Sequence, residues 1–203
     1  MKYLLGILLL IFTACGGDRN IETKKDEVLK VALANKPRSF DPQKNTDSST
    51  LAVTKQIYNN LFSLGENGEI ILELVESYEI EEDNSIILQL RKGIFFHDWN
   101  ELTSDDVKKS LERNLDIPVS RILVESIEKI EVLDKYRLKI VQKNSPSILI
   151  HNLAHSSTAI VKEIKTDSDI DLIGTGAYKI KDWSLSERIS LERFDKYYEK
   201  HTK

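Results

Sequence analysis

The stretch from Gly93 to Arg113, GIFFHDWNELTSDDVKKSLER, constrains the fold of this chain more than any other. It predicts the end of a strand, a tight connection and then a helix. Thr103 is suited to cap that helix, and Asp106 follows at the spacing of a capping box, with Asp in the place of Glu or Gln. Apolar residues recur every four positions, at Val107, Leu111 and Leu115. One face of the helix is therefore expected to pack against a core.

Alternating apolar residues around short turns predict several hairpins. The strands of the first two are 78–82 with 85–91, and 127–133 with 136–141. Their turns are Asp83-Asn84 and Asp134-Lys135. A third strand pair is predicted from the apolar residues between 178 and 194. The sequence therefore favours a sheet built from neighbouring strands.

Weaker patterns fill the rest of the chain. They predict a strand over 28–34, a helix over 51–63, a strand over 70–75 and a short helix over 147–154. An Asn-Gly turn stands at 67–68. Glu73 interrupts the apolar run of its strand. Pro118 is expected to end the central helix, so that residues 116–121 form a surface loop.

The N-terminus has the pattern of a bacterial export signal. Lys2 precedes an apolar run over 4–12, which is shorter than the roughly 20 residues of a membrane-spanning helix and fits a signal peptide. The run ends in FTAC, which resembles a lipobox. That resemblance implies removal of residues 1–14 and acylation of Cys15, which would anchor the chain to the lipid bilayer. Residues 15–27 are polar and predict a flexible tether. The alternative is an ordinary cleaved signal with a chance cysteine.

Composition excludes some function classes. A formal net charge of −4 without a local Lys/Arg cluster argues against nucleic-acid binding. His151 and His155 lie four residues apart on a predicted helix, but no third metal ligand is evident, so two polar positions on a short helix are favoured over a metal site. The segment 174–176 (GTG) lacks the rest of a dinucleotide fingerprint. No catalytic residue, metal or cofactor is predicted, and the chain is not expected to be an enzyme.

Two segments resemble the family 5 extracellular solute-binding proteins, the peptide- and nickel-binding lipoproteins of ATP-binding-cassette (ABC) importers. The first, 95–114, follows the pattern F-H-D-G-x-x-L-T-A-x-D-V-x-x-S. The positions in register are His97, Asp98, Leu102, Thr103, Asp106, Val107, Ser110 and Arg113. Trp99 stands where the family usually has Gly. The second, 174–193, is similar to G-T-G-x-Y-x-x-x-x-W followed by I-x-L-x-R, and it looks most like the oligopeptide-binding branch.

The resemblance runs from about residue 28 to 200 and implies an α/β fold like that of type 2 periplasmic binding proteins. The expected piece is the N-terminal lobe, with a mixed sheet, β-hairpins and short helices over 28–203. The second lobe and the C-terminal return are expected to be missing. Asp98 is expected to stabilise a turn by accepting backbone N–H bonds.

The resemblance also implies a function. The chain would capture peptides for an ABC permease, from the outer side of the cytoplasmic membrane, in the periplasm or at the cell surface. The segment 39–42 (SFDP) resembles a family loop, and the residues beyond it, Thr46, Asp47 and Ser48, would line one wall of the ligand cleft. The alternative is that they solvate a loop before a helix cap at Ser49 or Thr50. With one wall present, peptide affinity is expected to be weak or absent.

Three other functions are kept open. One is a non-transporting lipoprotein remnant or a surface scaffold. Another is a member of the same family that binds nickel or another small solute. The least favoured is a metal-dependent hydrolase that uses His151 and His155.

Overall fold

The computed structural model describes residues 29–35, 37, 39–44, 46–165, 170–184 and 188–199. The chain falls into two units, Met1–Ala32 and Leu33–Lys203. The predicted signal peptide, Cys15 and the tether lie outside the described residues. The predicted strand over 28–34 is not found in its described part, where Leu29 and Val31 are exposed. No strand in the described residues pairs with it, and an unpaired strand leaves its backbone groups without ladder hydrogen bonds.

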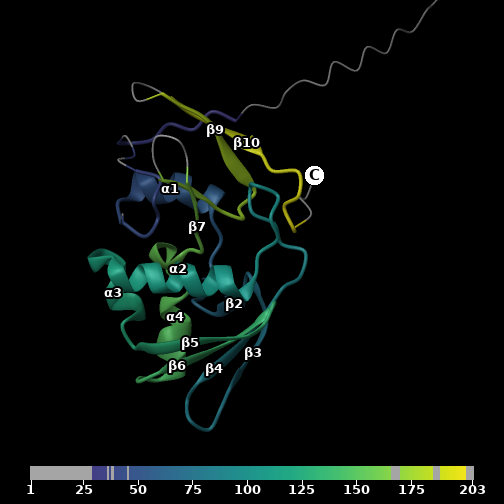
Figure 1. Ribbon diagram of the computed structural model, residues 1–203. Coiled ribbons are helices and arrows are strands. Elements are labelled where there is room, and N and C mark those ends of the chain that lie inside the picture. Colours follow the sequence, from purple (N-terminus) through teal and green to yellow (C-terminus); the bar gives the residue numbers. More distant parts are fainter. Residues whose placement is uncertain are drawn as a thin grey trace, which may run out of the picture. The chain divides into compact units, whose positions relative to one another are not determined.

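The second unit alternates short helices with hairpins (Figure 1). Its elements are α1 (Ser48–Ile57), β1 (Phe62–Leu64), β2 (Ile70–Leu72), β3 (Val75–Ile80), β4 (Ile86–Leu90), α2 (Ser104–Asp116), α3 (Pro118–Val124), β5 (Ile127–Asp134), β6 (Arg137–Gln142), α4 (Pro146–Asn152), a 3-10 turn (Ser156–Thr158), β7 (Lys162–Lys165), β8 (Ile170–Ile173), β9 (Tyr178–Ser184) and β10 (Arg188–Arg193).

A four-stranded sheet in the order β3-β4-β6-β5 forms the main layer. The hairpin predicted around the turn 83–84 is formed by β3 and β4, and the one predicted around 134–135 is formed by β5 and β6. Both predictions are confirmed. Asn84 takes the positive φ of 63° that the first turn requires, a conformation that Asn tolerates well. Every strand pair in the described residues is antiparallel, so the parallel pairing implied by a mixed sheet is not seen there.

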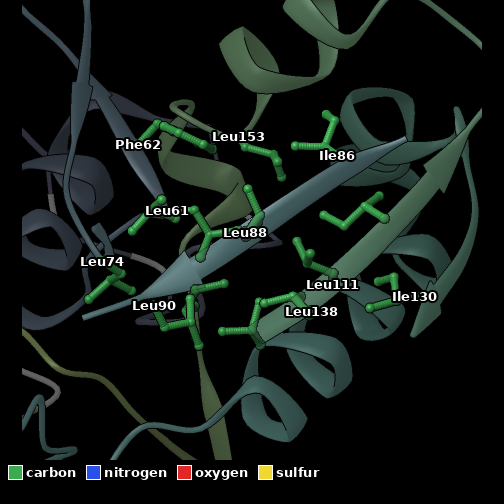
Figure 2. Packing of buried hydrophobic residues seen from close by; sticks show 14 of the residues in the cluster. Leu61, Phe62, Leu74, Ile86, Leu88, Leu90, Leu111, Ile130, Leu138 and Leu153 are labelled. Atoms are coloured by element: carbon green, nitrogen blue, oxygen red, sulfur yellow. The ribbon is translucent and has the colours of Figure 1, made fainter. Parts of the chain in front are cut away.

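The hydrophobic core lies between this sheet and helices α2 and α4. Alternate residues of β4, namely Ile86, Leu88 and Leu90, are buried, as expected for a strand with one core face. They pack with Leu111 of α2 and with residues of β1, β5, β6 and α4 (Figure 2). The capping box at the start of α2 is present as predicted, because Thr103 and Asp106 exchange side-chain and backbone hydrogen bonds. It fixes the first turn of the helix that covers the sheet.

A predicted helix and a predicted loop also differ from the structure. The helix predicted over 51–63 is α1, which ends at Ile57, and the chain then enters β1, which pairs with β2 across the predicted Asn-Gly turn. The loop predicted over 116–121 is instead occupied by α3, which begins at Pro118. Proline breaks a helix only in its interior, whereas at the first position its missing N–H has no partner to lose.

A second, smaller set of elements packs around α1. The predicted strand pair over 178–194 is confirmed as the β9–β10 hairpin, and β7 pairs with β8. Val53, Ile57 and Tyr58 form a separate buried cluster with residues Ala159 and Val161. No helix among the described residues is long and apolar enough to cross a membrane. This second set positions the candidate site at the start of α1.

Candidate functional site

The predicted ligand-binding segment, Thr46 to Ser48, stands at the N-terminus of α1 with all three residues exposed. Asp47 is the N-cap, and its Oδ1 accepts a hydrogen bond of 2.9 Å from the Thr50 backbone N–H. The cap predicted at Ser49 or Thr50 therefore lies earlier in the chain, because the Asp47 carboxylate satisfies an N–H that would otherwise lack a partner. Exposed hydroxyls and a carboxylate are suited to hydrogen-bond a polar solute, and ligand contact by this segment stays a prediction.

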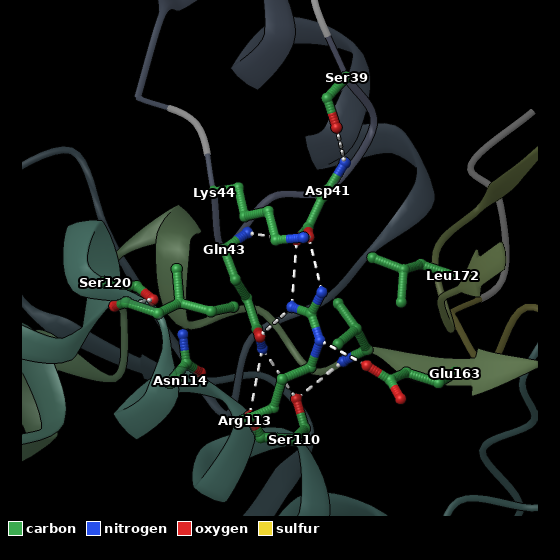
Figure 3. Close-up of polar contacts among 12 residues, drawn as sticks. Ser39, Asp41, Gln43, Lys44, Ser110, Arg113, Asn114, Ser120, Glu163 and Leu172 are labelled. Atoms are coloured by element: carbon green, nitrogen blue, oxygen red, sulfur yellow. Dashed lines mark hydrogen bonds and ion pairs between the residues drawn. The ribbon is translucent and has the colours of Figure 1, made fainter. Parts of the chain in front are cut away.

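A buried ion pair holds the loop that leads into this segment. Arg113 of α2 grips the Asp41 carboxylate with two nitrogens, Nη1 to Oδ1 at 3.2 Å and Nη2 to Oδ2 at 2.6 Å (Figure 3). The Asp41 and Arg113 side chains are only 9% and 17% exposed. Burial disfavours the charge of Arg113, but the hydrogen bonds and charges of Asp41 and Glu163 outweigh this, so the pKa of Arg113 is raised. The pair fixes the loop to α2.

The side chain of Gln43 connects the Asp41–Arg113 ion pair to Ser110 of α2 and to the backbone of Ala159. Its Nε2 donates to the Ser110 carbonyl, to Ser110 Oγ and to the Ala159 carbonyl, while its Oε1 accepts from Arg113 Nη1 at 2.6 Å. Ser110 Oγ also accepts from the Val161 backbone N–H at 2.9 Å. The loop 41–44, helix α2 and residues 159–161 are thereby joined. Arg113 matches a position of the family motif, but nothing in the sequence predicts its ion pair with Asp41.

The turn after β4 joins the two sets of elements. His97 donates its backbone N–H to the Gly174 carbonyl at 3.0 Å, and its Nε2 lies 3.0 Å from the Gly176 carbonyl, a contact that needs the proton on Nε2. Burial lowers the pKa of His97, which favours the neutral ring. Asp98 accepts from the Asn100 backbone N–H at 3.0 Å, as predicted, and from Lys162 Nζ at 2.8 Å. Through these contacts, His97 and Asp98 hold the turn against residues 174–176 and Lys162.

Trp99 adopts a left-handed backbone conformation, which glycine adopts more easily than any other residue. Its φ is 68°, a region that costs a residue with a side chain about 1–2 kcal/mol. Its ring packs edge-on against Phe194 at 5.5 Å, and Lys196 Nζ lies 5.1 Å from the ring centroid. These contacts offset part of the conformational cost.

The histidine pair is not arranged as predicted. His151 belongs to α4, but the helix ends at Asn152 and His155 lies beyond it. The Nδ1 of His155 accepts from the Ser157 backbone N–H at 3.1 Å and caps the 3-10 turn. The described residues hold no group of three or more His, Cys, Asp or Glu side chains that could bind a metal ion.

Comparison with known proteins defines the class. The family model "Bacterial extracellular solute-binding proteins, family 5 Middle" matches residues 69–203, so the chain belongs to this family. The glutathione-binding protein GsiB of Shigella dysenteriae serotype 1 is 29% identical over 205 residues, which cover 96% of this chain and 38% of that protein. The chain thus spans well under half the length of this curated relative.

Solved structures agree with the fold. The oligopeptide-binding protein AppA from Bacillus subtilis, in complex with a nonapeptide, is 25% identical with a TM-score of 0.65, over 78% of this chain and 34% of AppA. NikA from Staphylococcus aureus, in complex with Ni(L-His)2, is 30% identical with a TM-score of 0.64, over 72% of this chain and 32% of NikA. The predicted fold, a part of a type 2 periplasmic binding protein, is confirmed.

Proposed function

We propose that this chain serves in the capture of short peptides for an ABC permease, on the outer side of the cytoplasmic membrane. Family membership supports a solute-binding role without catalysis. Peptides are favoured as the solute because glutathione is itself a tripeptide and AppA is seen with a nonapeptide. The complex of NikA with Ni(L-His)2 keeps a nickel chelate as the second candidate.

The observation that carries this proposal is the anchored start of α1. The Asp41–Arg113 pair and Gln43 fix the loop a few residues before the exposed predicted ligand-binding segment, Thr46 to Ser48. Such an anchor holds the polar groups in place before the solute binds. Binding then loses less conformational entropy, which would otherwise weaken the affinity. Hydroxyl and carboxylate oxygens accept hydrogen bonds from the N–H groups of a peptide, and the hydroxyls can also donate to its carbonyls.

The proposal is tested by thermal unfolding of the chain with glutathione, trialanine or a nickel–histidine complex at millimolar concentration. A solute that binds only the folded state raises the unfolding temperature. A rise with the two peptides supports peptide capture, and a rise with nickel–histidine alone supports the second candidate. A cooperative transition that none of the three solutes moves contradicts solute capture by this chain. The absence of a cooperative transition supports the remnant alternative.

Two substitutions at Asp47 separate helix capping from solute contact. Asp47→Ala is expected to lower the free energy of unfolding by about 1 kcal/mol because the cap is lost, whereas Asp47→Asn keeps the cap. If the carboxylate contacts a peptide, both variants bind trialanine about tenfold more weakly, which corresponds to roughly 1.4 kcal/mol. Isothermal titration calorimetry measures the affinity. Unchanged affinity in the folded Asp47→Asn variant would show that Asp47 is a cap only.

Anchoring through Cys15 is the remaining part of the proposal. In a bacterial host that processes lipoproteins, the chain is expected to incorporate an alkyne-labelled fatty acid and to sediment with membranes. Cys15→Ser should abolish both, because acylation needs the thiol. Stable anchoring requires more than one acyl chain, since a single chain binds only marginally. Labelling that survives in Cys15→Ser would contradict the assignment.

A further inference from the structure

The main sheet has an open edge along the outer side of β3 (Figure 1). β3 pairs with β4 on its inner side, and no strand among the described residues pairs with its outer side. The opposite edge strand, β5, has its register interrupted near both ends, and such irregularities hinder pairing with a further strand. β3 has one interruption, before Ser77, and residues 77–80 run regularly. The edge of β3 is therefore better suited to accept a further strand.

The backbone groups of Tyr78 and Ile80 point away from the sheet. The Glu81 N–H donates to the Ser85 carbonyl at 2.9 Å, so the backbone of Glu81 is directed at β4. Backbone direction alternates along a strand of an antiparallel pair, so residue 79 is directed at β4 as well, and the residues on either side of it are directed outward. The N–H and C=O groups of Tyr78 and Ile80 are thus presented along the open edge.

Apolar side chains accompany these backbone groups. Tyr78 and Ile80 are paired with Leu88 and Ile86 of β4, which are buried, so the four side chains share the core face of the sheet. At the edge this face is incompletely covered, because Tyr78 is 38% exposed and Ile80 is 49% exposed. The Tyr78 ring packs edge-on against Phe62 at 5.6 Å, which fixes its position. A strand added here would cover apolar surface as well as pair with the backbone.

The edge strand and its turn carry charge of one sign. Residues 76–83 contain five carboxylate side chains and no Lys or Arg. Lys139 of β6 pairs with two of these carboxylates. The other three are exposed and take part in no ion pair among the described residues: Glu76, Glu79 and Glu82. A second copy that added its own β3 would bring like charges together, so the edge favours a basic partner.

We propose that the outer edge of β3 binds an extended segment of a partner protein in which basic residues alternate with apolar ones. The segment adds a strand beside β3 and exchanges backbone hydrogen bonds with Tyr78 and Ile80, a recurring mode of peptide recognition. Its apolar side chains cover those two residues on the core face, and its Lys or Arg side chains lie on the other face, beside Glu79. The site is separate from the predicted ligand-binding segment and does not depend on the solute proposed above.

The test is amide hydrogen exchange of the whole chain, followed by NMR, with the blocked hexapeptide acetyl-Lys-Val-Lys-Val-Lys-Val-amide. Exchange of the Tyr78 and Ile80 N–H groups is expected to slow about tenfold or more when the peptide is saturating, because these groups gain partners. The N–H of Glu79 already faces β4 and should change less. The same peptide with N-methylated valines keeps its side chains but loses the N–H groups that would pair with β3, and it should not bind.

Two changes to the chain separate backbone pairing from charge. Ile80→Pro removes an outward N–H and none that is directed at β4, so the fold should persist while the hexapeptide binds about tenfold more weakly. Ile122→Ala, on α3 and 69% exposed, is the control for loss of an exposed isoleucine. Glu79→Lys combined with Glu82→Lys should weaken binding about tenfold, whereas Glu125→Lys at the exposed end of α3 should not. Isothermal titration calorimetry measures the affinities.

Several results would overturn the proposal. Unchanged exchange at Tyr78 and Ile80, or equal binding of the N-methylated peptide, would show that no strand is added to β3. Equal binding of a hexapeptide with Glu in place of Lys would contradict a basic partner. Dimerisation in sedimentation velocity that Ile80→Pro abolishes would assign the edge to a second copy instead. If Ile80→Pro does not fold, the N-methylated peptide still decides between pairing and its absence.

Discussion

Replacement of Arg113 by alanine is expected to lower the free energy of unfolding by about 3–5 kcal/mol, the loss typical when one partner of a buried ion pair is removed. The Asp41 carboxylate, whose side chain is 9% exposed, would lose the two close donors that Arg113 provides. Gln43 Oε1 would lose its 2.6 Å hydrogen bond at the same time. Urea denaturation of the variant and of the unaltered chain measures the difference.

The matched control is a charged pair on the exposed face of the same helix. Lys108 Nζ lies 3.8 Å from Glu112 Oε1, and the two side chains are 36% and 51% exposed. Lys108→Ala should cost less than about 1 kcal/mol, because surface pairs contribute little. A double variant, Asp41→Asn with Arg113→Met, removes both charges and should recover part of the stability lost in Arg113→Ala. Equal losses in the two alanine variants would show that the buried pair is no more important than a surface one.

This ion pair marks the limit of what the sequence predicts about the site. Asp41 and Arg113 are separated by 72 positions, and each was recognised through a different motif. Hydrophobic periodicity does not tell which polar residues of two distant motifs meet. The ligand-binding segment is predicted from its position just after one motif. The structure shows which contacts anchor the loop before that segment.

Local signals predicted the fold where turn chemistry and alternation coincide. The hairpins around Asp83-Asn84 and Asp134-Lys135 and the cap at Thr103 depend on neighbours within a few residues. The sequence predicts a helix over 51–63 that is longer than α1, because Leu61 and Phe62 continue the apolar stripe of the helix. Tertiary packing instead places Phe62 in β1 and Leu61 just before it. The strand predicted over 28–34 is absent from the described residues of that segment. A strand needs a neighbouring strand to pair with, and the residues of one segment do not specify that partner.

The largest backbone effect is expected at Gly174, where alanine should lower the free energy of unfolding by about 3 kcal/mol, at the upper end of ordinary overpacking costs. A Cβ added there would lie 2.1 Å from the Ile57 carbonyl oxygen and 2.5 Å from Tyr58 Cδ1. The first contact is with backbone, which cannot rotate away as a side-chain end can. The Gly174 carbonyl also accepts from the His97 N–H, so a displacement would strain the turn that joins the two sets of elements.

Gly68 provides the comparison that separates steric contact from backbone conformation. Its φ is 81°, but a Cβ there would meet no atom within 4 Å. Gly68→Ala should therefore cost only the conformational penalty, about 1–2 kcal/mol, while Gly174→Ala costs more although no positive φ is involved. Thermal and urea unfolding of both variants give the two losses. If Gly174→Ala costs no more than Gly68→Ala, then the end of α1 can move away from residue 174, and the close approach that explains glycine in this motif is not rigid.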